Sequence, residues 1–441
     1  MSSSTAEGKG KEREAGGEDD DIAGPYIMRP LANGLEAIGK AECVEVSGTD
    51  MYVGTSHGHI VHYTVSMAEL DSTQMTAVPE RFCVGTVSLG LGGKRVEQIL
   101  AFPMLNRLVV LCGPTAQVLS LPELRAVPGT TIKGVTCLSY DERVKRSEAV
   151  AAILCVARVR SIQLYRLTGA ELRLEREVPI ACSVAAICQY GRYLCVADTE
   201  AYKILDLADD VKSMSALELF PTQQPRTDPG SGRVIRPPRP RTLVVGVNEF
   251  MFLTSSSTSD DDDNDSDSDA TTLGVVVTAL GEAQRGTLQF AAYPKSVVYD
   301  APFLIVAFAA SVDVYDTRQP EQTLAQRFFE QSPDAARPRR VCAAAGFLAG
   351  TCVAQLDGED DEPMLSRAGC ALSAVASARI VAVAPDAVYV LAGKPLPPLL
   401  GVDRLLRAGR VEEAVAAVDA ALAGEDASLR SSAEARYCLL M

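Results

Sequence analysis

The sequence lacks the features that mark most membrane and metal-dependent proteins. No apolar run in its 441 residues approaches the ~20 residues that a helix needs to cross a bilayer, and the N-terminus has no apolar core of a signal peptide. We therefore expect a cytoplasmic protein. None of the 12 cysteines lies in a C-x-x-C pair, so the sequence suggests neither a zinc ribbon nor a redox dithiol. We expect most of these cysteines to be buried thiols.

An excess of basic charge is also missing. The chain has 42 Lys and Arg against 57 Asp and Glu, a net charge of −15. Three short segments account for this excess of acid, namely residues 1–24, 259–269 and 357–362, and the remaining body is close to neutral. A near-neutral body offers no excess of basic charge to bind nucleic acid, and the acidic segments would repel phosphate. We therefore do not expect nucleic acid as a partner.

The sequence contains no common template for catalysis or cofactor binding. It has no G-x-x-x-x-G-K-[ST], no G-x-G-x-x-G after a strand, no H-E-x-x-H and no EF-hand loop. The aspartate run near residue 260 lacks the glycine and the closing glutamate of a calcium loop, so we interpret it as a solvated loop. Within that run, Ser266 and Ser268 would suit an acid-directed kinase. We expect no enzyme activity, no catalytic, cofactor-binding or metal-binding residues, and no cofactor.

One stretch matches the sequence pattern around the nucleophilic serine of some hydrolases. GTSHG, residues 54–58, fits the nucleophile pattern G-x-S-x-G. That site needs a helix after Ser56 and a histidine further along the chain, whereas HIVHYTV has strand character and no histidine follows His62. We interpret GTSHG as the polar tip of a β-hairpin, with Gly58 supplying a positive φ.

The three histidines of the chain gather around this hairpin but do not predict a metal site. His57 and His59 share one parity along a strand, whereas His62 falls on the opposite face. No carboxylate or thiol is placed in sequence to complete a tetrahedron. We expect ordinary surface histidines.

What the sequence does contain is a small unit that recurs with a period of roughly 50 residues. Each unit has an apolar run, a turn, a second run, a polar tip and a third run, with nothing helix-like between. The units begin near Cys43, Val96, Gly134, Ser183, Arg241 and Lys295, and a weak last one ends in ARIVAVAPDAVYVLAG. This spacing predicts an all-β fold, a β-propeller of about seven blades, because stacked sheets bury faces that a single sheet leaves exposed.

The propeller is expected over residues 25–395, and a candidate for the strand that completes the ring is the segment PYIMRPL at its start. Residues 1–24 form a predicted disordered acidic tail, and residues 255–271 a disordered acidic insertion in the fifth unit. The Pro- and Arg-rich residues 221–241 predict an extended connection between blades, either a spacer or a docking strip for an acidic partner or a Pro-binding module.

Near residue 396 the spacing of apolar residues changes from that of strands to that of helices. Apolar residues recur at helical spacing in two segments of PLPPLLGVDRLLRAGRVEEAVAAVDAALAGED, which predicts a helical hairpin over residues 396–441. A single hairpin cannot bury its own apolar face, so we interpret it as the start of an α-solenoid.

Several strings carry a family resemblance. They are PYIMRPLANGLEAIGKAECVEVSGTDMYVGTSHGHIVHYTV, RVEQILAFPMLNRLVVLCGPTAQVLSLPEL and YLCVADTEAYKILDL, followed by ARIVAVAPDAVYVL with LLRAGRVEEAVAAVD. Together they resemble the citron-homology (CNH) domain of the fungal CORVET tethering-subunit family of vacuolar protein sorting. That family is related to the transforming growth factor-beta receptor-associated proteins.

The resemblance implies a non-enzymatic subunit of an endosomal or vacuolar vesicle-tethering complex, peripheral on those membranes. Its implied partners are an early-endosomal Rab-type GTPase and other tethering subunits. The alternative is a CNH propeller that serves as a Rho-type GTPase-binding or membrane-binding signalling scaffold. On exposure grounds alone, GTSHGHI and PPRPR are candidate GTPase-contacting segments.

Overall fold

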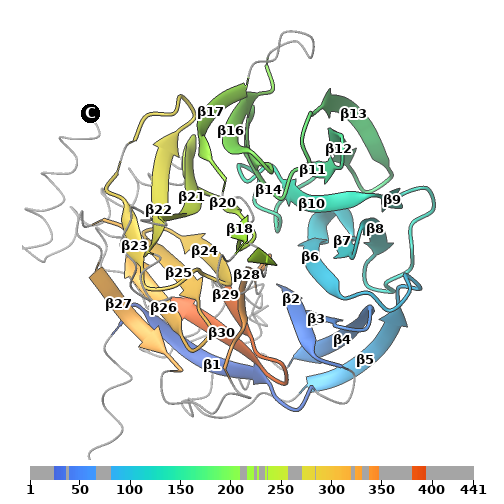
Figure 1. The fold of residues 1–441 in the computed structure, drawn as a ribbon. Helices are drawn as coiled ribbons and strands as arrows, with labels where there is room; N and C mark the ends of the chain where they lie inside the picture. The colour runs from blue at the N-terminus through green and yellow to red at the C-terminus, as the bar shows by residue number, and fades with distance from the viewer. Residues whose placement is uncertain are drawn as a thin grey trace, which may run out of the picture.

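The computed structural model shows a ring of seven four-stranded antiparallel sheets (Figure 1). The structure describes residues 24–35, 39–65, 81–208, 216–222, 226–227, 234–235, 237–256, 271–283, 285–318, 323–329, 337–346 and 380–393. The predicted all-β propeller of seven blades is confirmed. The helical hairpin predicted for residues 396–441 lies outside the described residues.

The first four blades follow one another along the chain. Blade 1 contains β2 (Ala41–Ser47), β3 (Asp50–Thr55), β4 (His59–Val65) and β5 (Arg81–Ser88). Blade 2 contains β6 (Val96–Phe102), β7 (Arg107–Cys112), β8 (Thr115–Ser120) and β9 (Ile132–Lys133). Blade 3 contains β10 (Val135–Tyr140), β11 (Ala152–Arg158), β12 (Ser161–Leu167) and β13 (Leu172–Pro179). Blade 4 contains β14 (Ala186–Tyr190), β15 (Tyr193–Ala197), β16 (Ala201–Asp206) and β17 (Ala216–Pro221).

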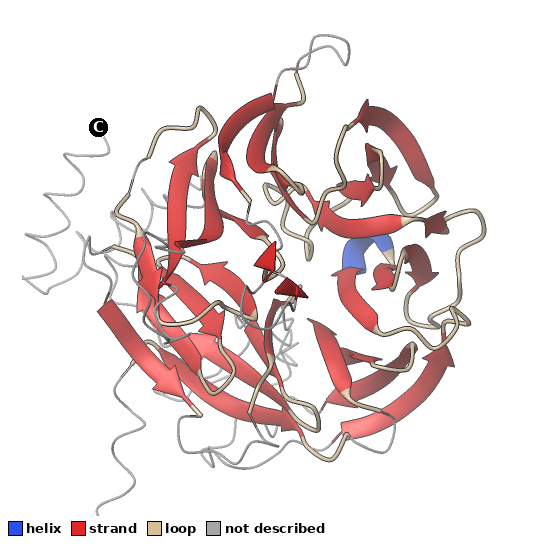
Figure 2. Ribbon diagram, in the orientation of Figure 1, coloured by secondary structure: helices blue, strands red, loops and turns tan. Residues whose placement is uncertain are grey.

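The remaining blades complete the ring. Blade 5 contains β20 (Arg241–Gly246), β21 (Glu249–Ser256), β22 (Thr271–Thr278) and β23 (Leu288–Phe290). Blade 6 contains β24 (Ser296–Asp300), β25 (Phe303–Ala307), β26 (Val312–Asp316) and β27 (Thr323–Phe328). Blade 7 contains β28 (Arg340–Ala343), β29 (Ile380–Val383), β30 (Val388–Gly393) and, as its outermost strand, β1 (Tyr26–Ala32). Among the described residues, the one helix is the 3₁₀ turn η3 (Pro103–Leu105), drawn in blue in Figure 2.

Hydrophobic side chains fill the spaces between neighbouring blades. Each of the seven interfaces carries its own buried cluster; between blades 5 and 6, for example, Met251, Phe290 and Leu304 are packed together. A sheet inside the ring has neighbours on both faces, which is why its strands are apolar runs rather than strictly alternating ones. Burial is thus distributed around the ring instead of being gathered in one core.

Small residues let the blades approach one another closely. Gly54 on β3 is the clearest case: a Cβ there would lie 2.7 Å from Sγ of Cys43 and 2.7 Å from Cγ1 of Val96 on the next blade. Ala157 and Ala197, near the ends of the second strands of blades 3 and 4, are fully buried. Larger side chains at such positions would force the blades apart.

Ring closure uses the N-terminal strand, as the sequence suggested. β1 pairs with β30 in antiparallel register from Tyr26 opposite Gly393 to Ala32 opposite Val388. Tyr26 also joins blade 7 to blade 6: its hydroxyl donates to Oδ2 of Asp300 at 2.8 Å, and its backbone N–H donates to Oε1 of Gln326 at 3.0 Å. The two ends of the propeller therefore hold each other in one sheet.

The two insertions differ in part from their sequence predictions. The ladder of β21 and β22 continues to Ser256 opposite Thr271, so both ends of the predicted disordered segment 255–271 belong to strands, and residues 257–270 lie outside the described residues. The connection 221–241 is more than an extended spacer, because β18 (Arg226–Thr227) pairs with β19 (Val234–Ile235) within it. Backbone hydrogen bonding, rather than composition, sets these boundaries.

Candidate functional site

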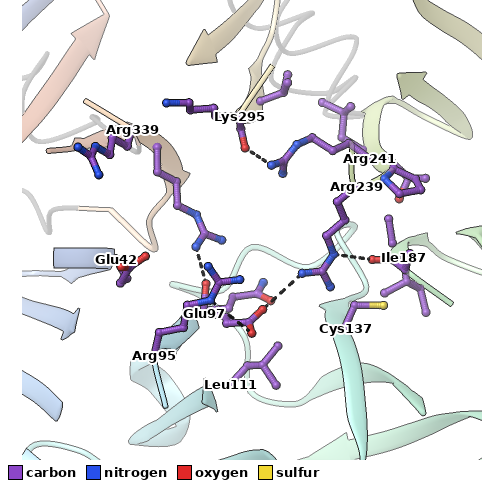
Figure 3. A pocket seen from close by; sticks show the side chains of 18 residues that line it. Glu42, Arg95, Glu97, Leu111, Cys137, Ile187, Arg239, Arg241, Lys295 and Arg339 are labelled. Carbon is purple, nitrogen blue, oxygen red and sulfur yellow. Dashed lines mark hydrogen bonds and ion pairs between the residues drawn. The ribbon is translucent and has the colours of Figure 1, made fainter. Parts of the chain in front are cut away.

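A cavity of about 450 Å³ lies on the axis of the ring (Figure 3). Every blade contributes a residue of its innermost strand to the lining: Glu42, Glu97, Cys137, Ala186, Thr242, Val297 and Arg340. A space bordered by all seven inner strands can only be the central channel of the propeller. It is the place where side chains from distant parts of the sequence converge.

The lining of this cavity is strongly cationic. Its basic members are Arg95, Arg239, Arg241, Lys295, Arg339 and Arg340, whereas its acidic members are Glu42 and Glu97. Six positive charges against two negative ones leave a formal charge of +4. We call the six basic residues the axial cation cluster.

The cluster arises from one recurring position. Arg95 and Lys295 directly precede the inner strands β6 and β24, while Arg241 and Arg340 begin the inner strands β20 and β28. Inner strands of a propeller run in the same direction along the axis, so residues at their starts gather at one end of the channel. A basic residue at the start of four inner strands therefore produces one concentrated charge.

Some of the basic side chains cross-link different blades. Arg239 donates from Nη2 to the carbonyl oxygen of Thr136 at 2.8 Å, from Nε to that of Ala185 at 3.1 Å, and from Nη1 to Oε2 of Glu97 at 3.4 Å. Arg340 donates from Nη1 to the carbonyl oxygen of Glu97 at 2.6 Å, which joins blade 7 to blade 2. These two arginines have clear structural roles.

Arg241 is held among like charges. It donates from Nε to the carbonyl oxygen of Pro294 at 3.2 Å and from Nη2 to that of Lys295. Desolvation lowers the pKa of Arg241 to about 10, with Arg340 and Arg239 acting in the same direction against the opposing effect of Tyr293. Neutral carbonyl oxygens accept hydrogen bonds from Arg241 but supply no negative charge. A bound anion would therefore stabilise the charged form of its guanidinium.

Other members of the cluster are not engaged in this way. Within the described part of the chain, neither the ammonium of Lys295 nor the guanidinium of Arg339 has a hydrogen bond or an ion pair. Nε of Arg95 lies 3.7 Å from Oε1 of Glu97, and the Arg95 side chain is 61% exposed. Cross-linking the blades does not explain why these three cations line the cavity.

A buried ion pair lies further along the same axis. The Glu45 side chain is 0% exposed and that of Arg146, from the loop between β10 and β11, is 3% exposed. Nη1 of Arg146 donates to Oε2 of Glu45, and Nη2 donates to the carbonyl oxygen of Ala343 at 2.7 Å. Burial raises the pKa of the Glu45 carboxyl, and Arg146 together with backbone N–H donors opposes that rise.

The backbone N–H groups that complete this pair come from three blades. Oε1 of Glu45 accepts from Val46 at 3.1 Å and from Ala345 at 2.6 Å, and Oε2 accepts from Ala101 at 3.2 Å. The carboxylate therefore ties together the inner parts of blades 1, 2 and 7. A fully bonded ion pair of this kind leaves no charge over for a ligand.

The inner strands relate the two features. Glu42 lines the cavity and Glu45 follows three residues later on β2; on β28, Arg340 lines the cavity and Ala343 contacts Arg146. Three residues of strand span about 10 Å, so the ion pair lies about that far along the axis from the cation cluster. The channel is cationic at one end and crossed by a neutral, bonded pair beyond it.

The structure places GTSHG at a hairpin tip, as predicted. Strand β4 follows the turn where a hydrolase would need a helix, and Gly58 has a φ of 76°. Oγ of Ser56 and Nδ1 of His57 lie 3.1 Å apart on the exposed turn. The expectation of surface histidines is wrong for His62, which is 5% exposed on β4 with its Nε2 2.8 Å from Oδ1 of Asp50. Among the described residues, no group of three or more His, Cys, Asp and Glu side chains is placed to hold a metal ion.

The two segments named as candidates from sequence behave differently. GTSHGHI remains a hairpin apart from the cavity, whereas PPRPR, residues 237–241, delivers Arg239 and Arg241 into it. Sequence reasoning missed Arg95, Lys295 and the pair Arg339 and Arg340. Their signal was available as a basic residue directly before an apolar inner run, in KRVEQIL, PKSVVY and PRRVCA.

Comparison with known proteins decides the family. The family model described as the VPS3 N-terminal domain matches residues 40–330, which is more than half of the chain and runs from β2 to β27. The chain belongs to the VPS3 N-terminal domain family. The match covers six of the seven blades, and the predicted relationship to vacuolar sorting subunits and transforming growth factor-beta receptor-associated proteins is confirmed.

Relatives of this VPS3-family chain include proteins of both names and a protein kinase. Transforming growth factor-beta receptor-associated protein 1 of Homo sapiens is 29% identical over 200 residues, 44% of this chain and 22% of that protein. Vacuolar protein sorting-associated protein 3 of Saccharomyces cerevisiae is 22% identical over 302 residues, 68% of this chain and 27% of that protein. The human serine/threonine-protein kinase MRCK gamma is 28% identical over 240 residues, 52% of this chain and 14% of that protein. The VPS3-family chain thus matches about a quarter or less of each of these relatives.

Solved structures similar to this VPS3-family propeller include the AfRom2 CNH domain. It is 13% identical in sequence, the similarity covers 84% of this chain and 99% of that one, and the TM-score is 0.47.

The described residues of the chain contain no helix that is long and apolar enough to cross a membrane.

Proposed function

We propose that this protein acts, without enzymatic activity, as a subunit of a vesicle-tethering complex of the CORVET type in endosomal and vacuolar protein transport. The match of the VPS3 N-terminal domain to residues 40–330 carries this proposal. The relatives named for vacuolar protein sorting and for receptor association support a binding role rather than a catalytic one. The protein would be cytoplasmic and peripheral on endosomal or vacuolar membranes.

The proposed partners are an early-endosomal Rab-type GTPase and other subunits of the complex. A ring of seven blades presents many loops and hairpin tips on a rigid frame, and such loops are common sites of recognition. The distributed burial between blades supports a frame that stays fixed while its loops bind. The GTPase would be recognised in its GTP-bound state.

The test is capture of purified GTPases on the immobilised full chain. An early-endosomal Rab loaded with a non-hydrolysable GTP analogue should be retained at least tenfold more than the same Rab loaded with GDP, and a late-endosomal Rab serves as the specificity control. Equal retention in both nucleotide states, or none in either, would contradict the Rab proposal. Recovery of other tethering subunits from a lysate on the same column tests the complex separately.

The alternative is a signalling scaffold that binds a Rho-type GTPase or a membrane. The similarity to MRCK gamma supports this alternative, because a segment similar in sequence to this propeller occurs there in a protein named as a kinase. The same column distinguishes the two: nucleotide-dependent retention of a Rho-type GTPase with no retention of the Rab would replace the tethering proposal with this one.

A further inference from the structure

The axial cation cluster presents more positive charge than the described residues neutralise. Its six basic side chains face two carboxylates, and Glu97 is already shared between Arg239 and Arg95. Charges gathered in a recess repel one another and lose hydration, so such a set is stable when an opposite charge is brought to it. The missing charge is about four units of negative sign.

We propose that the axial cavity binds a small soluble molecule that carries two or more phosphate groups. A phosphate carries about 1.5 to 2 negative charges at neutral pH, so two phosphates would balance the formal charge of the lining. Guanidinium groups pair with phosphate oxygens in bidentate geometry, and the cavity supplies such groups from several blades. A volume of about 450 Å³ also suits a compact ligand.

A purely structural role accounts for only part of the cluster. The side chains of Arg239, Arg241 and Arg340 donate to backbone carbonyls outside their own blades, and those bonds would hold the ring with or without a ligand. The side chains of Lys295 and Arg339 make no hydrogen bond to any described residue and still line the same space. Their positions are explained if they contact a bound anion.

The shape of the channel argues for a compact ligand over a chain. All seven inner strands border the cavity, and about 10 Å further along the Arg146 side chain bonds Glu45 of blade 1 and Ala343 of blade 7, crossing the channel there. A nucleic-acid strand or an acidic polypeptide would need a continuous path, which this crossing interrupts. A lipid head group would have to leave its bilayer to enter a recess of this kind.

The experiment is isothermal titration calorimetry of the full chain with three probes: inositol hexakisphosphate, pyrophosphate and orthophosphate. The first two should bind, and orthophosphate should bind at least tenfold more weakly because it reaches fewer cations. Raising the salt concentration should weaken all binding.

The decisive variant combines Lys295→Gln with Arg339→Gln, the two cations without a structural partner. It should weaken inositol hexakisphosphate binding about tenfold or more and leave the unliganded melting temperature unchanged. The matched control is Arg125→Gln with Arg173→Gln, which removes the same charge from two exposed arginines outside the cavity lining and should bind like the unaltered chain.

Several results would overturn the proposal. They are an absence of binding by either polyphosphate at millimolar concentration, an equal loss of affinity in the control variant, unchanged affinity in the cavity variant, and, in a parallel sedimentation assay with phosphoinositide vesicles, binding to the vesicles without binding to the free probes. GTPase capture is measured in a separate assay with a separate ligand, so either proposal can fail without the other.

Discussion

The channel contains two arrangements of charged residues, one that stabilises the fold and one that is available to a ligand. Glu45 is bonded by Arg146 and by backbone N–H groups of three blades, whereas the charged groups of Lys295 and Arg339 line the cavity with no hydrogen bond or ion pair to a described residue. The first arrangement completes its own hydrogen bonding and serves the fold. The second leaves binding capacity unused, which is what a ligand site requires.

Substitution Glu45→Ala should strongly destabilise the protein. It leaves the Arg146 guanidinium buried without its counter-charge, and removal of one partner of a buried pair typically costs about 3 to 5 kcal/mol. Urea denaturation followed by circular dichroism measures this as a lower midpoint. The control is Glu175→Ala, which breaks the exposed pair of Glu175 with Arg166 and should leave the midpoint nearly unchanged. Equal midpoints for the two variants would show that the axial pair does not hold the blades together.

For single residues, the sequence predicted the local backbone geometry better than it predicted which charged side chains come together in the fold. The positive φ of Gly58 follows from a turn chemistry that five consecutive residues specify. The cation cluster brings together residues as far apart as Arg95 and Arg340, and a body with nearly zero net charge conceals any such local excess. Once the blade period is aligned, the basic residue before each inner run becomes visible, and that alignment needs the fold.

Individual strands follow the apolar runs of the sequence closely, and the exceptions have physical causes. The weak last unit contains β29 and β30, but its inner strand β28 was missed because residues 344–379 separate it from its neighbour in the sheet. The short pair β18 and β19 was also missed, since a ladder of two residues per strand leaves no periodic pattern. Sequence patterns identify strands, whereas pairing over an insertion depends on the completed ring.

Replacing residues 257–270 with Asn-Gly should leave the thermal midpoint within about 2 °C of the original. The ladder of β21 and β22 closes at Ser256 opposite Thr271, and a two-residue turn can join strands in that register. Differential scanning calorimetry measures the effect. As a positive control, Leu253→Ala in the same hairpin removes a side chain that is 1% exposed and should cost about 2 to 5 kcal/mol. A drop of many degrees on replacement would mean that the insertion stabilises the propeller.

The propeller as a whole depends on a contact between its two ends. β1 and β30 are separated by more than 350 residues in the chain, yet they are neighbours in blade 7. Until both are present, the outer edge of β30 has no partner, and an open edge is prone to pair with other chains. Closure of the ring is therefore the step that turns seven sheets into one cooperative body.

Deleting residues 1–32, and with them β1, should lower the unfolding midpoint by on the order of 10 °C, because buried Leu31 and the bonds of Tyr26 are lost together. Deleting residues 1–23 alone is the control and should change little. Thermal unfolding monitored by circular dichroism compares the two, and light scattering reports aggregation through the exposed edge. Equal midpoints for both truncations would show that the ring is stable without this strand.

The seam in blade 7 also determines how the molecule would respond to mechanical load. Tyr26 lies opposite Gly393, so the two ends of the propeller leave the β1 and β30 ladder on the same side. Hydrogen bonds of an antiparallel pair lie perpendicular to the strands, and tension applied at this side would reach them one after another instead of all at once. Pulling on the two ends would therefore unzip the seam at low force and open the ring there first, while the other six blades keep their ladders.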